Sequence, residues 1–195
     1  MRNIIFAEGE YYHVYNRGVD KRSIFQDEDD FKRFLKVTQK LLGEGLLGDS
    51  HRRPLQVQLF AYCLNPNHFH LLFKLVGVGD LTKFMHSLGT SYTMYFNKKN
   101  GRSGRLFANT FKAVHVDSEA QLIWLLTYIN FNAEIHGVIA RAQDYVWCSC
   151  RHYLEIESNP LLTAQPVRSD RTTVFGQKEF MKMEKARKAR LSLEA

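Results

Sequence analysis

The stretch Asn65-Pro66-Asn67-His68-Phe69-His70-Leu71-Leu72-Phe73 combines a turn sequence, two histidines and an apolar run. Alternate side chains of a β-strand share a face, so His68 and His70 are expected to point to one side of a strand. Two neighbouring imidazoles on a strand supply half of a divalent-metal site. The stretch therefore predicts a strand with a candidate metal site, although two polar residues on a wetted strand face are the simpler reading.

The segments around this stretch predict an α+β fold. Because Asn65-Pro66-Asn67 favours a turn, the strand before it and the strand after it are expected to form a hairpin. The order strand, helix, strand, strand, helix, strand matches a ferredoxin-like arrangement. We therefore expect an antiparallel sheet with helices mainly on one face. The expected strands are residues 10–19, 55–64, 68–76 and 111–116, and the expected helices are residues 27–42, 80–96 and 118–136.

The last of these helices carries a second polar pair. Tyr128 and Asn132 are four residues apart and so share one helical face. The helix opens with a capping-box pattern at Ser118 and Gln121 and is apolar nearly all round, which is typical of a buried helix. A lone tyrosine or asparagine in a helix is usually structural, but buried polar groups need partners. The pair therefore favours a polar site beside the helix.

Composition and charge indicate which kinds of partner and which cellular location suit the chain. The chain has 195 residues, with 27 Lys and Arg against 20 Asp and Glu, a net charge of +7. Such a surplus suits an anionic partner, most often nucleic acid, although a merely basic soluble protein is the alternative. The three cysteines do not form a disulfide framework, which fits a reducing cytoplasm. We expect a cytoplasmic protein with no membrane partner, since no signal peptide or membrane-length apolar run is present.

Basic residues gather between the second helix and the fourth strand, with no acidic residue among them. Such a cluster can neutralise backbone phosphates of DNA. Asn16 and Arg17 end the first strand, where they either face nucleic acid or form a turn. Nearby aromatic residues can stack bases, but core packing is the favoured reading for them. The basic cluster consists of Lys98, Lys99, Arg102, Arg105 and Lys112, and the aromatic residues are Tyr92, Tyr95, Phe96 and Phe107.

The character of the chain changes after about residue 155. Residues 158–170 contain two prolines and read as a linker, and residues 177–193 are basic and helix-prone. We therefore expect one domain over residues 1–155 and a basic extension over residues 156–195. This extension is either a solvated tail or a nucleic-acid contact.

Five motifs follow one another along the chain: Tyr12-His13-Val14-Tyr15-Asn16-Arg17-Gly18, Asn67-His68-Phe69-His70-Leu71-Leu72, Gly104-Arg105-Leu106-Phe107 with Phe111-Lys112-Ala113, Tyr128-Ile129-Asn130-Phe131-Asn132, and residues 144–154. Together they resemble the single-tyrosine HUH transposases, the IS200-like family, and within it the REP-associated tyrosine transposases. The resemblance covers residues 10–155 and implies a fold of the HUH endonuclease type. Family members often continue with Asn-Pro-Val after the tyrosine helix, whereas here Asn132 is followed by Ala133 and Glu134.

The resemblance implies an enzyme that cleaves and rejoins single-stranded DNA at or near hairpins. Tyr128 would be the nucleophile, and cleavage would leave a 5′-phosphotyrosine and a free 3′-hydroxyl. A phenol with a pKa of ~10 needs activation, and a divalent metal can make the target phosphate more electrophilic. His68, His70 and Asn132 would hold that metal, and imidazole with amide oxygen suits Mg²⁺ or Mn²⁺. The implied partner is single-stranded and hairpin DNA resembling REP palindromes, bound by a monomer or a homodimer.

Two other functions are compatible with the residues. The first is a module that binds hairpin nucleic acid without cutting it. The second is a small metal-dependent hydrolase built on His68, His70 and either His13 or His115. The absence of carboxylates at ligand spacing from these histidines disfavours the hydrolase.

Overall fold

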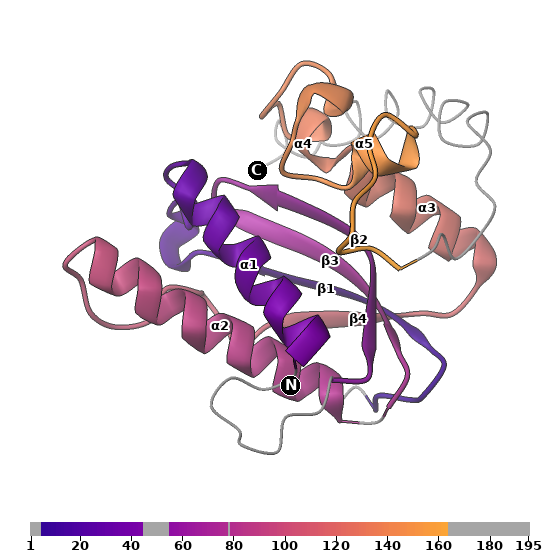
Figure 1. The fold of residues 1–195 in the computed structure, drawn as a ribbon, viewed down its shortest axis with the longest axis horizontal. Coiled ribbons are helices and arrows are strands. Elements are labelled where there is room, and N and C mark those ends of the chain that lie inside the picture. The colour runs from indigo at the N-terminus through magenta and orange to yellow at the C-terminus, as the bar shows by residue number, and fades with distance from the viewer. Residues whose placement is uncertain (1–4, 45–54, 78, 164–195) are drawn as a thin grey trace, which may run out of the picture.

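The four strands form one antiparallel sheet in the order β2-β3-β1-β4 (Figure 1). The fold is known from a computed structural model that describes residues 5–44, 55–77 and 79–163. The ferredoxin-like α+β prediction is confirmed. The strands are β1 (Tyr11–Arg17), β2 (Val57–Asn65), β3 (His68–Leu75) and β4 (Lys112–Val116), and the longer helices are α1 (Glu28–Glu44), α2 (Asp80–Lys99) and α3 (Glu119–Asn130).

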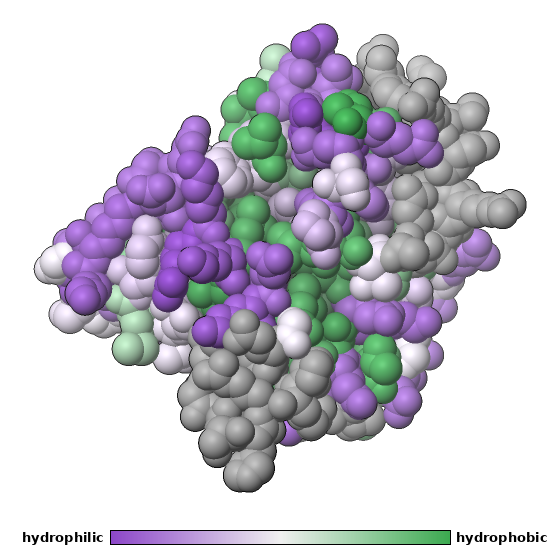
Figure 2. Space-filling view, viewed as in Figure 1, coloured by the Kyte–Doolittle hydropathy of each residue, from purple (hydrophilic) through white to green (hydrophobic). Residues whose placement is uncertain are grey.

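The two longest helices, α1 and α2, lie side by side across one face of the sheet (Figure 1). Each turns its apolar stripe inward, and their outer sides are hydrophilic, as the left of Figure 2 shows. Tyr92, Phe96 and Phe107, which could have served as stacking platforms for bases, are buried there. Core packing is therefore their role in the structure.

The other face of the sheet carries α3 and the short helices α4 (Asn132–Ile135) and α5 (Cys150–Tyr153). Its separate apolar core includes Phe60 and Leu72 from the strands and Ile129 from α3. This is the face to which His68 and His70 point, because they pair with Arg17 and Tyr15 of β1 on that side. The third helix thus lies on the histidine side, while α1 and α2 cover the opposite side.

The third helix begins as expected and ends earlier than expected. Gln121 donates its backbone N–H to Ser118 Oγ at 3.3 Å, which confirms the capping pattern at its start. The helix ends at Asn130, and the chain bends at Phe131 before it resumes as α4. Asn132 therefore lies on α4 and is not part of the Tyr128 helix.

The chain beyond α5 still touches the domain in the part that the structure describes. The backbone N–H of Thr163 donates to Leu59 O at 2.8 Å, and Asn159 Nδ2 donates to the hydroxyl of Tyr62 at 2.9 Å. The predicted linker and basic helix beyond residue 163 lie outside the described residues. No helix among the described residues is both long enough and apolar enough to cross a membrane.

Candidate active site

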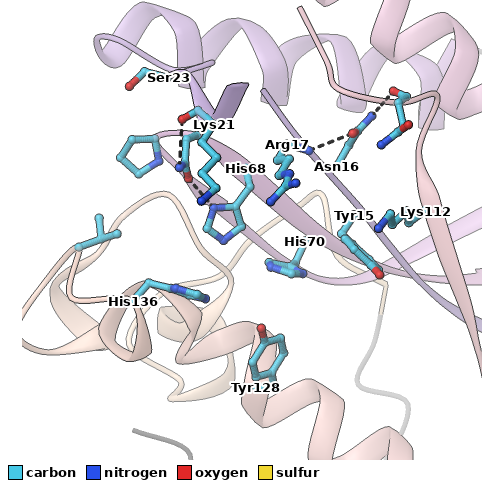
Figure 3. Close-up of a pocket in the computed structure, with 14 residues that line it drawn as sticks. Tyr15, Asn16, Arg17, Lys21, Ser23, His68, His70, Lys112, Tyr128 and His136 are labelled. Atoms are coloured by element: carbon cyan, nitrogen blue, oxygen red, sulfur yellow. Dashed lines mark hydrogen bonds between the residues drawn. The ribbon is translucent and has the colours of Figure 1, made fainter. Parts of the chain in front are cut away.

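A groove of about 820 Å³ opens on the histidine side of the sheet, between the ends of β1 and β3 and the helix α3 (Figure 3). The pairing of β1 with β3 explains which strand residues line this groove, because it places Arg17 beside His68 and Tyr15 beside His70. The α3 helix supplies Tyr128 from across the groove. The structure thus brings together the histidine pair and the tyrosine, which are about 60 residues apart in the sequence.

Tyr128 is held between two aromatic rings. Its ring stacks on Trp124, one turn earlier on α3, with centroids 5.2 Å apart and planes 10° apart. It meets the ring of His70 edge-on, with centroids 5.6 Å apart. The hydroxyl end of Tyr128 lines the groove beside the two histidines (Figure 3). The Tyr128 hydroxyl therefore shares one groove with the two strand histidines.

Hydrogen bonds on both ring nitrogens fix the orientation of His68. Its Nδ1 lies 2.6 Å from Asn67 Oδ1, and its Nε2 lies 3.0 Å from Asn65 Nδ2. An amide nitrogen only donates, so Nε2 accepts and the proton of the neutral ring is on Nδ1. His68 therefore directs the lone pair of Nε2 toward the buried side chain of Asn65.

His70 is oriented by a third histidine. Its Nδ1 lies 2.8 Å from Nε2 of His13, and the two rings stack with centroids 5.0 Å apart. Tyr15 stacks on both rings. Burial lowers the pKa of His13 to about 4, so His13 is neutral near pH 7. Nδ1 is thus the nitrogen of His70 that contacts His13, and Nε2 is on the other edge of the ring.

Asn132, the expected third ligand, is fully buried beside His68 rather than exposed in the groove. Its Oδ1 accepts a hydrogen bond of 2.6 Å from Asn65 Nδ2. Its own Nδ2 has no hydrogen-bond partner among the described residues. The oxygen of Asn132 therefore points toward Asn65, and the Asn65 amide in turn contacts His68.

The sequence profile of the family described as "Transposase IS200 like" matches residues 8–132, which is more than half of the chain. The chain belongs to the IS200-like transposase family. Its fold is similar to that of a REP-associated tyrosine transposase bound to a REP hairpin, with a TM-score of 0.58 and 15% identity over 88% of this chain and 94% of that chain. A candidate transposase from Deinococcus radiodurans R1 matches with a TM-score of 0.41 and 17% identity, over 66% of this chain and 93% of that chain. No curated protein matches. Family membership makes this chain a DNA-processing enzyme.

Two residues of the candidate site in this IS200-like transposase, His136 and Asn65, were not indicated by the sequence motifs. His136, at the end of α4, lines the groove with its ring centroid 5.0 Å from that of His68 (Figure 3). Asn65 contacts both His68 and Asn132. His136 follows Asn132 by four residues, which is a helical spacing that the sequence does show. Asn65 gave no such signal, because its position at the end of β2 matters only once the hairpin is formed.

Three basic side chains line the groove of this transposase: Arg17, Lys21 and Lys112. Arg17 and Lys112 are exposed at the ends of β1 and β4, where they are positioned to meet phosphates (Figure 3). Asn16, predicted as a DNA contact, uses its side chain differently. Its Nδ2 donates to Asn109 O at 2.9 Å and to Thr110 O at 2.8 Å, so it ties the loop before β4 to β1.

The remaining basic residues of the predicted cluster lie elsewhere, and two of them have structural partners. Lys99 forms ion pairs with Asp27 at 2.6 Å and with the buried Asp30 at 2.8 Å. Arg102 donates to Asn97 Oδ1 at 2.6 Å and lies over the Phe96 ring. The acidic partners of Lys99 are about 70 residues away in the sequence, which is why the cluster looked unpaired. Lys98 lines a groove along α2, and Arg105 lines a neighbouring groove that shares Asn109 with the histidine site.

Of the two further histidines considered for the hydrolase alternative, His13 lies beside His70 and His115 does not. His115 points to the α1 and α2 side of the sheet, where it pairs with Tyr12, and its Nε2 lies 2.8 Å from Glu10. No cluster of three or more histidine, cysteine or acidic side chains suited to a metal occurs in residues 5–44, 55–77 and 79–163. The three cysteines are buried and form no disulfide. Any metal site on the histidine side therefore needs amide oxygens, water or DNA oxygens.

Proposed function

We propose that this chain is a metal-dependent tyrosine transposase that cleaves and rejoins single-stranded DNA at or near hairpins. The observation that carries this proposal is the edge-on contact of Tyr128 with His70 in a groove that also holds His68, Arg17 and Lys112. The related fold named above was solved with a REP hairpin. We propose the same class of DNA for this chain, and we place it among the REP-associated branch.

In the proposed reaction Tyr128 is the nucleophile. Its Oη forms a bond to the scissile phosphorus while the bond from phosphorus to the 3′ oxygen breaks. The phenol loses its proton to water in the open groove, and the departing 3′ oxygen takes up a proton. The product is a 5′-phosphotyrosine, which a 3′-hydroxyl can attack in the reverse direction. Because one phosphoester replaces another, rejoining needs no external energy source.

Mg²⁺ or Mn²⁺ is the proposed cofactor. When bound, the cation would polarise the phosphoryl oxygens and make phosphorus more electrophilic. The donor set fits such a cation, because His68 presents Nε2, His70 presents Nε2, and Asn132 directs its oxygen to the same side. His136 is a further imidazole beside His68. Arg17, Lys21 and Lys112 would hold the DNA backbone across the mouth of the groove.

A covalent-trap assay tests the proposal. Labelled hairpin oligonucleotides with single-stranded flanks, drawn from the source genome, would be incubated with the protein in Mn²⁺, in Mg²⁺ and in EDTA. We expect a denaturant-resistant protein–DNA adduct with either metal and none in EDTA, and peptide mapping should place it on Tyr128. Tight hairpin binding without an adduct would instead support the non-cutting binding module.

His13 is expected to support metal binding through His70. In the proposed tautomer, Nδ1 of His70 donates to His13 Nε2, which would hold the His70 ring with Nε2 toward the metal. Replacing His13 with leucine should weaken Mn²⁺ binding by about 10–100-fold, as measured by titration calorimetry. His13→Gln supplies an amide oxygen as acceptor and should restore most of the affinity. An unchanged Mn²⁺ affinity in His13→Leu would show that this hydrogen bond does not orient the ligand.

Lys112 and Lys99 are expected to differ in their effect on DNA binding. Lys112 is exposed at the groove, so Lys112→Met should lower the slope of log affinity against log salt by about 1. Lys99 is occupied by Asp27 and Asp30, so Lys99→Met should leave that slope unchanged and reduce the free energy of unfolding by about 1 kcal/mol. Hairpin titrations at several salt concentrations and urea unfolding measure the two effects. An equal loss of DNA affinity in both variants would contradict this assignment.

A further inference from the structure

Asn65 lies at the centre of the proposed ligand set. It ends β2, directly opposite His68 across the β2–β3 hairpin, and its side chain is fully buried. Its Nδ2 lies 2.6 Å from Asn132 Oδ1 and 3.0 Å from His68 Nε2. A single amide nitrogen therefore contacts the atoms that two of the proposed metal ligands would offer to a cation.

The chemistry of this amide resembles that of a bound cation. A side-chain NH₂ group carries two protons and accepts no hydrogen bond. One proton can point to Asn132 Oδ1 and the other to His68 Nε2, so the group engages a lone pair on each atom. These are the lone pairs that a divalent metal requires, since a histidine ligand must be neutral and an amide binds hard cations through oxygen.

The surroundings of Asn132 agree with this reading. Its Nδ2 is buried without a partner among the described residues, while its Oδ1 is engaged by Asn65. The side chain thus directs its acceptor toward the site even though its donor is left unpaired, and an unpaired buried donor is unfavourable. On the other side of Asn65, its own Oδ1 lies 3.8 Å from the thiol of Cys63. The Asn65 amide is therefore oriented with its nitrogen toward His68 and Asn132 and its oxygen toward Cys63.

We propose that the Asn65 amide competes with the divalent cation, holding His68 and Asn132 in place when no cation is bound and withdrawing when the cation binds. Asn65 is then a positioning residue that tunes metal affinity. The inference rests on the proposed metal-dependent function and adds a residue that regulates loading of the site. The physical basis is that the cation binds only the fraction of protein molecules in which the Asn65 amide has withdrawn. The smaller this fraction is, the weaker is the apparent affinity for the cation.

The test compares two asparagines that contact opposite nitrogens of the same histidine. Asn65→Leu removes the competing N–H groups at similar volume, and we expect Mn²⁺ to bind about tenfold tighter than to the wild-type full-length chain. Asn67→Leu removes the acceptor for His68 Nδ1, and we expect Mn²⁺ to bind about 10–100-fold more weakly. Affinities would be measured by titration calorimetry and by electron paramagnetic resonance of Mn²⁺, in the absence of DNA.

Thermal unfolding gives a readout independent of catalysis. In EDTA, Asn65→Leu should have a lower Tm than the wild type, because His68 and Asn132 lose their shared donor. Saturating Mn²⁺ should raise the Tm of this variant by more than that of the wild type, since a tighter ligand stabilises more at the same concentration. Asn65→Ala, which removes the amide without adding bulk, takes the same role if the leucine variant does not fold.

The outcomes separate the inference from the function on which it rests. Weaker or unchanged Mn²⁺ affinity in both Asn65 variants, with clear binding by the wild type, would contradict the proposed competition. Asn65 would then be a metal ligand or a purely structural residue. If neither the wild type nor the Asn65 variants bind Mn²⁺, the proposed metal dependence itself fails. Tight binding seen only in the Asn65 variants would support the competition in its strongest form.

Discussion

Tyr128→Phe is expected to abolish the covalent protein–DNA adduct, with a loss of cleavage of about 10³-fold or more. The change removes one oxygen atom, which is the only atom of this residue that can form a bond to phosphorus. The phenylalanine ring should keep its stack on Trp124 and its contact with His70. Hairpin affinity should therefore stay within about twofold of the wild type, which gel-shift titration beside the trap assay would measure.

Tyr15→Phe is the matched control for this prediction. Tyr15 lines the same groove and stacks on both His13 and His70, but it lies on β1 rather than on α3. This variant should keep the adduct. If the adduct persists in Tyr128→Phe and disappears in Tyr15→Phe, the nucleophile is Tyr15. The attack on phosphorus would then come from a side chain of β1 rather than from one of α3.

Removal of either histidine of the strand pair is expected to have the second-largest effect. His68→Ala and His70→Ala should each lower metal-dependent cleavage by about 10²-fold or more, since a cation loses one of few protein ligands. Mn²⁺ binding should be lost in both variants. Hairpin binding should persist, because Arg17, Lys21 and Lys112 remain to contact the backbone. Single-turnover cleavage, Mn²⁺ titration and gel shifts distinguish these three effects.

His115→Ala provides the control on the same sheet. Its side chain points to the opposite face and pairs with Glu10, so cleavage and Mn²⁺ binding should both be unchanged. The variant His136→Ala tests whether this further imidazole, whose ring lies beside that of His68, also contributes to cleavage and Mn²⁺ binding. Full cleavage in His70→Ala would contradict the proposed role of the histidine pair and favour a site organised around other residues.

Much of the fold could be predicted because its signals are local. The Asn65-Pro66-Asn67 turn joins two strands of β-forming residues, and the strand positions agree with the structure to within about two residues. The helix between β3 and β4 follows from its apolar spacing. The end of the third helix was less predictable, because the bend at Phe131 depends on how α4 packs against β2.

The site was only partly predictable, because its contacts join distant segments. The shared face of His68 and His70 follows from the period of a strand. The hydrogen bond between His70 and His13 does not, since it requires β1 to lie next to β3. Lys99 is the opposite case, a residue that looked available for DNA and that the fold pairs with Asp27 and Asp30.

The sequence by itself determined the elements, the pairing of His68 with His70 on one face, and the family to which the chain belongs. These depend on residue order and local periodicity, which a one-dimensional pattern records. Only the tertiary structure decided that Asn65 bridges His68 and Asn132 and that Asn132 is buried. It also decided that only Arg17 and Lys112 of the six predicted basic residues, together with Lys21, line the groove with Tyr128. The reason is physical: hydrogen bonds and ion pairs form between side chains that chain folding brings within about 3 Å, and the order of strands in the sheet sets which side chains these are.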